Sequence, residues 1–162
     1  HGGNVPESKM VVPYSMLLNL ASVSGAEEKD QLWGFIQRYA PDTSAETNPD
    51  MDQAAGFAVR YYNDFVKPTK VFRAPTDIER EALEDLRDRL KSWDGELDVD
   101  ALQSEVFACG RERFDPMRGW FTALYEVLLG ASQGPRFGGF IALYGVDETV
   151  ALIDRALAGE LL

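Results

Sequence analysis

The sequence has little of the side-chain chemistry on which most enzymes rely. Its 162 residues include one cysteine, Cys109, and one histidine, His1. A lone cysteine excludes an internal disulfide, and these two residues together cannot assemble a structural zinc site. A terminal histidine is a poor general base because chain ends are usually frayed. Cys109 lies on the apolar side of a helical pattern, which favours a buried thiol over a reactive one.

Long apolar runs and nucleotide-binding motifs are also missing. No apolar stretch reaches the roughly 18 residues of a membrane-spanning helix, and the first residues lack the regions of a signal peptide. The sequence contains no GxxxxGK[ST] phosphate loop. The opening His1-Gly2-Gly3 without an initiator methionine favours a fragment of a longer protein. We therefore expect a cytoplasmic, reduced, non-catalytic chain without a metal, a cofactor of its own or a membrane partner.

Positive charge is scarce and unevenly placed. The formal net charge of −11 argues, taken whole, against a polyanionic partner. The range 77–112 holds twelve acidic residues against five basic ones, whereas 54–73 holds four basic residues against one acidic residue. The acidic stretch carries carboxylate pairs, which we interpret as a solvated charged surface rather than as a catalytic site.

What the sequence does have is apolar residues at helical spacing, with no convincing two-residue alternation. Prolines stand at expected helix starts, glycines follow expected ends, and Thr76 to Glu79 form a capping-box pattern. The pattern predicts an all-α bundle of about seven to nine helices in one domain, 1–162, with possible sub-bundles 1–73 and 74–162. The expected helices span 13–24, 27–39, 49–66, 76–93, 100–107, 115–130, 137–144 and 147–157.

The end of the 49–66 helix and the residues that follow it, RYYNDFVKPTKVFR (60–73), interleave basic and aromatic side chains. Such a composition suits phosphate pairing combined with base stacking. The alternative is structural: Tyr61 and Phe65 are four residues apart and can face the core while Lys67 and Lys70 remain solvated.

A second stretch, GASQGPRFGGFIALYG (130–145), places Arg136 in a glycine-rich loop before an apolar helix. Gly134 and Gly138 allow close approach of a backbone, and Pro135 stiffens the loop. Arg136 offers fixed donors to a phosphate or a base edge, and Phe137 offers a ring for stacking. The alternative is a plain connector with Arg136 in water.

Three stretches, PYSMLLNLASVSGAEEKDQLWGFIQRYAP, AVRYYNDFVKP and LYEVLLGASQGPRFGGFIALYGVDETVALIDRAL, closely resemble the C-terminal part of class I lysyl-tRNA synthetase. The resemblance covers essentially the whole chain, and the last stretch is also similar to the end of bacterial glutamyl-tRNA synthetases. It implies an all-helical anticodon-binding domain, called a helix cage, attached to a catalytic domain that activates lysine with ATP. The signatures His-Ile-Gly-His and Lys-Met-Ser-Lys-Ser are absent here, so that catalytic domain is expected elsewhere in the same polypeptide.

The resemblance also implies a set of tRNA-binding residues and a partner, lysine tRNA. In the loop they are Gly134, Pro135, Arg136 and Phe137, and in the helical stretch Arg60, Tyr61, Tyr62 and Lys67 match in kind. The acidic stretch is expected to face away from tRNA. The competing hypothesis is an acidic helical adaptor that binds a partner protein, for which the Arg136 loop is a connector.

Overall fold

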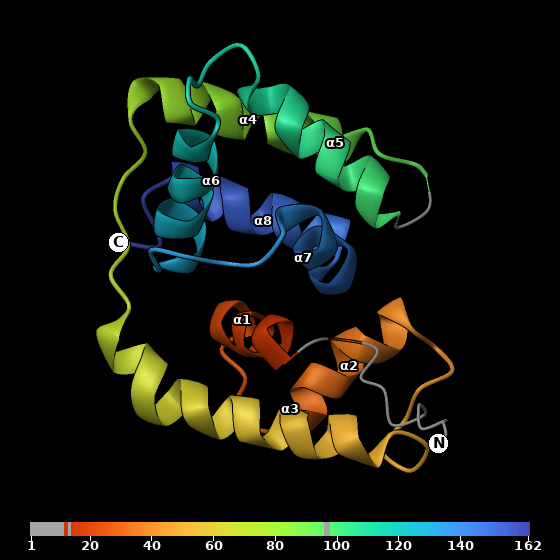
Figure 1. Cartoon of the computed structure of the whole chain (residues 1–162). Coiled ribbons are helices and arrows are strands. Elements are labelled where there is room, and N and C mark those ends of the chain that lie inside the picture. Colours follow the sequence, from red (N-terminus) through yellow and green to blue (C-terminus); the bar gives the residue numbers. More distant parts are fainter. Residues whose placement is uncertain (1–11, 13, 96–97) are drawn as a thin grey trace. The chain divides into compact units, whose positions relative to one another are not determined.

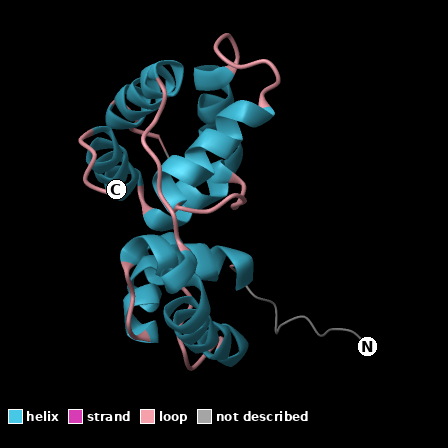
Figure 2. Ribbon diagram, turned by 90° about the vertical axis from the view of Figure 1, so that its left-hand side faces the viewer, coloured by secondary structure: helices cyan, strands magenta, loops and turns pink. Residues whose placement is uncertain are grey.

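The structure, a computed structural model, describes residues 12, 14–95 and 98–162, and within these residues it contains eight α-helices and no strand (Figures 1 and 2). The predicted all-α fold is confirmed. His1 and Pro13 lie outside the described residues. The helices are α1 (Tyr14–Ser24), α2 (Lys29–Tyr39), α3 (Pro49–Tyr61), α4 (Asp77–Lys91), α5 (Val99–Gly110), α6 (Arg118–Leu124), α7 (Phe137–Tyr144) and α8 (Val146–Leu157).

Three short segments extend these helices. A π-helical turn, η2 (Tyr62–Val66), and a 3-10 turn, η3 (Lys67–Thr69), continue α3. A second π-helical turn, η4 (Tyr125–Leu129), continues α6. The single long helices expected over 49–66 and 115–130 therefore each change from α to π geometry before they end.

Local capping explains where two helices begin. The Thr76 hydroxyl accepts a hydrogen bond from the Glu79 N–H at 3.3 Å, and the Glu79 carboxylate accepts one from the Thr76 N–H at 2.9 Å, which completes the predicted capping box. At α5 the cap is Asp98, so the helix begins at Val99, one residue before the expected start at 100. The extended backbone of Asp98 lets its carboxylate accept the N–H groups of Asp100 and Ala101.

The chain forms two units, 1–69 and 70–162. The sequence suggested a boundary at 73/74, but the residues just before that point are held by the second unit. The Val71 N–H donates to the Gly130 carbonyl at 3.2 Å, the Phe72 ring lies against Gly130, and Arg73 pairs with Glu79 and Glu126. These contacts place the boundary before residue 70.

Each unit has its own core. In unit 1, α3 packs against α1 and α2, and the fully buried side chains include Leu17, Leu20, Leu32, Ile36, Met51, Ala55 and Ala58. In unit 2, α7 packs on α5 and α8 packs on α4 (Figure 1). Helix α7 is buried around nearly its whole circumference, with Phe137, Phe140, Ile141 and Leu143 in the core of this unit. This central position of α7 determines how the loop before it is held.

Candidate nucleic-acid interface

The loop of unit 2 that joins η4 to α7 is attached to its unit at both ends. It begins at Gly130, which adopts a left-handed conformation with φ of 69° that favours glycine and ends the π-helical turn. Near the other end, the half-buried Tyr125 hydroxyl donates a hydrogen bond to the Pro135 carbonyl at 2.9 Å. Pro135 itself is buried. The loop is therefore a defined support for the residue that follows, Arg136.

The glycines of this loop are used for internal packing, which differs from the expectation that they admit a nucleotide. A Cβ at Gly134 would lie 2.5 Å from Cδ1 of Tyr125, and one at Gly138 would lie 2.6 Å from the backbone nitrogen of Gln103. The Gly138 N–H also donates to Oε1 of Gln103 at 2.6 Å. These contacts bring the loop and α7 close to their own unit, so both glycines are explained by the fold.

Arg136 is the exposed group that this support presents. Its side chain is 62% exposed, and its Nη2 lies 3.4 Å from Oδ1 of Asp100, which is more exposed still. A pair of this kind in water contributes little to stability. The guanidinium can therefore exchange Asp100 for an incoming phosphate or base edge at small cost.

Phe137 is not available for the stacking role that the sequence suggested. Its ring is fully buried and lies 5.3 Å from the Phe140 ring, centroid to centroid. The reason is its place as the first residue of α7, the central helix of unit 2. Arg136 and Phe137, adjacent in sequence, therefore point to solvent and to the core respectively.

Arg73, one of the cations of the basic and aromatic stretch, belongs to the structure of unit 2. Its guanidinium makes two hydrogen bonds to Glu79, at 2.7 and 3.0 Å, and one to Glu126 at 2.7 Å. The bond to Glu79 raises the pKa of Arg73. Burial acts to raise the pKa of Glu79, but the hydrogen bonds from Arg73 and Thr76 outweigh it and hold that pKa below its usual value.

In unit 1 the predicted residues divide between surface and core. Arg60 and Lys67 are exposed, and neither forms an ion pair among the residues that the structure describes. Tyr61 is exposed, whereas the neighbouring Tyr62 is buried and burial raises the pKa of its hydroxyl. Tyr62 is thus part of the core of unit 1, contrary to the expectation of a contact residue.

The structure also shows a row of aromatic side chains on unit 1 that was not predicted from the sequence. The row consists of Tyr14, Phe57, Tyr61 and Phe65, with successive ring centroids 5.8, 6.3 and 5.2 Å apart. Three of its members are exposed: Phe57 by 52%, Tyr61 by 40% and Phe65 by 63%. The signal in the sequence is the four-residue spacing of 57, 61 and 65. The alternative that Tyr61 and Phe65 face the core is wrong, because both are exposed.

An open groove of about 560 Å³ lies beside α2 and α3 in the same unit. Its Lys29 and Asp52 form an ion pair at 2.7 Å, and the Trp33 indole N–H donates to Asp52 at 2.9 Å. The hydrogen bond from Lys29 lowers the pKa of Asp52. The residues that line the groove include two cations, Lys29 and Arg60, and four carboxylates. This excess of negative charge makes the groove less suited to a polyanion than the aromatic row.

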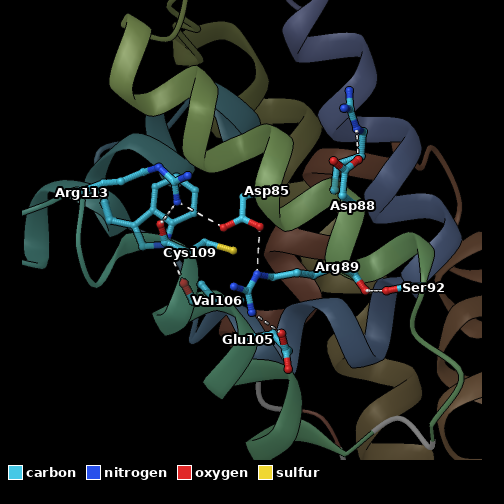
Figure 3. A network of polar contacts seen from close by, with 10 residues as sticks. Asp85, Asp88, Arg89, Ser92, Glu105, Val106, Cys109 and Arg113 are labelled. Carbon is cyan, nitrogen blue, oxygen red and sulfur yellow. Dashed lines mark hydrogen bonds and ion pairs between the residues drawn. The ribbon is translucent and has the colours of Figure 1, made fainter.

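Cys109 is buried within an ionic network that joins α4 to α5 (Figure 3), as predicted for a core thiol. Asp85 accepts hydrogen bonds from Arg89 at 3.0 Å and Arg113 at 3.2 Å, and Arg89 also donates to Glu105 at 2.9 Å. Burial raises the pKa of the Cys109 thiol to about 12. The thiol therefore stays protonated at neutral pH and is unsuited to nucleophilic chemistry.

Among residues 12, 14–95 and 98–162, no group of three or more histidine, cysteine or carboxylate side chains is placed to hold a metal ion. Within the same ranges, every helix is too short or too polar to cross a membrane.

The structure thus defines an all-helical protein region with an exposed loop arginine and an exposed aromatic row, and comparison with known proteins identifies its relatives. Over all 162 residues the chain is 80% identical to the lysine–tRNA ligase of Roseobacter denitrificans, of which it covers 31%. Over 159 residues, 97% of the chain, it is 42% identical to the lysine–tRNA ligase of Rickettsia bellii and 41% identical to that of Rickettsia felis, and it covers 30% of each.

The chain is homologous to a region of lysine–tRNA ligases, and it spans less than a third of the length of these relatives. No family model matches the sequence. No solved structure matches it either.

Proposed function

We propose that this chain is the part of a class I lysine–tRNA ligase that recognises the anticodon loop of lysine tRNA. The observation that carries the proposal is the 80% identity to a lysine–tRNA ligase over the whole chain, combined with coverage of only 31% of that relative. A ligase of this kind must both activate an amino acid and select a tRNA. An all-helical region without a nucleotide-binding motif fits selection better than activation.

The chemistry of the exposed groups supports the same proposal. Unpaired loop bases are read by stacking on aromatic rings and by hydrogen bonds to their edges, and phosphates are neutralised by cations. Arg136 supplies an exposed guanidinium on a defined loop, and the stretch 60–67 supplies the exposed side chains of Arg60, Tyr61 and Lys67. We propose these four residues as the contact set, with Gly134 and Pro135 shaping the loop.

The remaining parts of the reaction fall to the rest of the polypeptide in this proposal. ATP and lysine are bound by a catalytic domain outside this chain, which then joins lysine to the tRNA in the cytoplasm. The acidic surface of α4 faces away from the tRNA because like charges repel.

A filter-binding titration of the 162-residue chain tests the proposal. We expect tighter binding of lysine tRNA than of a non-cognate tRNA, and an affinity that falls as salt is raised. Equal binding of both tRNAs, or binding of neither, would contradict it and would favour the acidic adaptor hypothesis.

A further inference from the structure

The aromatic row runs along α3 and continues into the π-helical turn that follows it. Phe57, Tyr61 and Phe65 are successive four-residue steps, and in an α-helix each such step rotates by about 40° because each residue turns by roughly 100°. Side chains four residues apart are therefore neighbours on the helix surface. The π-helical turn η2 carries Phe65, whose ring centroid lies 5.2 Å from that of Tyr61.

The rings of the row are supported from one side and open on the other. Tyr14 on α1 contacts Phe57 edge to face, with ring planes at 61°. Phe57 and Tyr61 are nearly parallel, with planes at 18°. The core of unit 1 is filled by other residues of α3, including Met51, Ala55 and Ala58, so the exposed rings are not needed to complete it. A run of apolar rings in solvent at this place indicates a binding surface.

The charges near the row indicate the kind of partner. Arg60 precedes Tyr61 and Lys67 follows Phe65, and among the described residues neither cation is paired with a carboxylate. Arg60 also lines the groove beside α2 and α3, and the exposed Asp64 stands between Tyr61 and Phe65 in sequence. The stretch 60–67 still holds two cations against one carboxylate, and this local positive charge accompanies the exposed rings in a chain with a net charge of −11. Together they match a single-stranded nucleic acid, which brings phosphates and flat π faces at once.

From these observations we infer that Phe57, Tyr61 and Phe65 form a stacking platform for unpaired bases of the tRNA loop, with Arg60 and Lys67 on its phosphates. This inference rests on the proposed function and adds a site on unit 1 to the Arg136 loop.

The test compares three versions of the chain: wild type, the double variant Phe57→Leu/Phe65→Leu, and Phe107→Leu. Leucine keeps an apolar side chain but removes the π face. Phe107 is an exposed ring on unit 2 outside the row and serves as the matched control. Each version is titrated with the anticodon stem-loop of lysine tRNA and with the same stem-loop carrying abasic loop positions.

We expect the double variant to bind the intact stem-loop about tenfold or more weakly than wild type, and Phe107→Leu to bind it like wild type. Wild type should bind the abasic stem-loop more weakly than the intact one. Wild type and the double variant should bind the abasic stem-loop with the same affinity, because a ring without a base to stack on contributes nothing. Tyr61→Trp in an otherwise unchanged chain gives a second readout: added stem-loop should quench the fluorescence that this tryptophan adds.

The outcomes separate the inference from the proposed function. If the double variant binds the intact stem-loop like wild type, and wild type still prefers lysine tRNA, the platform is wrong while tRNA recognition stands. If wild type binds no tRNA, both are wrong. If RNA binding is unchanged but wild type self-associates in sedimentation and the double variant does not, the row is a protein interface and the inference is overturned.

Discussion

The Tyr125 hydroxyl donates a hydrogen bond to the Pro135 carbonyl, and the Tyr125 ring fills the space that a side chain at Gly134 would need. One half-buried tyrosine thus fixes both residues that precede Arg136. The loop holds Arg136 through contacts inside its own unit, before any ligand is present. Such preorganisation lowers the entropy cost of binding.

Tyr125→Phe should weaken this support without unfolding the chain. The ring that packs on Gly134 remains, but the Pro135 carbonyl loses its donor, so we expect about 1 kcal/mol less stability in urea unfolding. We also expect faster amide exchange around Arg136. Unchanged stability and exchange would show that the hydrogen bond does not restrain the loop.

Gly138→Ala should be much more damaging than its size suggests. The new methyl group would lie 2.6 Å from backbone atoms of α5, which cannot move aside like a flexible side chain. We expect a loss of about 2 kcal/mol or more in thermal or urea unfolding. The matched control is Gly34→Ala in α2, where no atom lies within 4 Å of the new Cβ, and which should stabilise by about 0.5 to 1 kcal/mol.

Arg73→Gln should destabilise unit 2 in a pH-dependent way. It leaves the buried Glu79 carboxylate without its cation, which we expect to cost about 2 to 4 kcal/mol at pH 7. The pKa of Glu79 in the folded chain lies below its ordinary value of 4.5. The stabilisation of the folded state by the Arg73–Glu79 pair is therefore complete above pH 4.5 and is lost as the pH falls through the folded pKa.

The difference between wild type and Arg73→Gln in urea unfolding should therefore be largest near neutral pH and shrink below pH 4.5. Arg118→Gln, which alters an exposed arginine on α6, serves as the control and should change little. A pH-independent difference would mean that Arg73 acts through packing rather than through the Glu79 charge.

The sequence predicted most of the helices because burial imposes the 3.6-residue period directly on the apolar residues. It did not predict which aromatic side chains of 57–65 are exposed. The helical period alone does not decide which of the adjacent Tyr61 and Tyr62 faces the core, and the structure buries Tyr62 while Tyr61 and Phe65 stay at the surface. The pairing of Arg73 with Glu126, 53 residues away in sequence, likewise follows from the tertiary fold and has no local signal.

Of the loop before α7, the sequence indicates the position of Arg136 but not the packing around it. A glycine-rich loop with one arginine is visible in the sequence, and the structure leaves Arg136 exposed. Whether a glycine serves a ligand or a neighbouring ring is decided by what lies opposite, which for Gly134 is Tyr125. The adjacent Phe137 follows the apolar pattern of α7 into the core.

Arg136→Ala should weaken binding of the lysine anticodon stem-loop by about 1 to 3 kcal/mol and reduce discrimination between anticodons, as expected for a contact to a base edge. A phosphate contact would instead weaken all stem-loops alike and lower the salt slope by about 0.7 to 0.9. Arg111→Ala removes another exposed arginine and is the control.

Asp100→Asn keeps Arg136 and removes the negative charge next to it. It removes the carboxylate that lies 3.4 Å from Arg136, so we expect slightly tighter RNA binding, by less than about 1 kcal/mol. If Arg136→Ala and Asp100→Asn both leave the binding curves superimposable on wild type, Arg136 is a solvated residue on a connector.

The central claim, recognition of the anticodon, is tested most directly by competition between two stem-loops that differ only in their three anticodon bases. The chain is mixed with a labelled lysine anticodon stem-loop and titrated with unlabelled stem-loops bearing either the lysine anticodon or an altered one. We expect the altered stem-loop to compete at least tenfold less well at the same salt concentration. Equal competition by both would contradict anticodon recognition, because binding would then depend on the phosphate backbone alone.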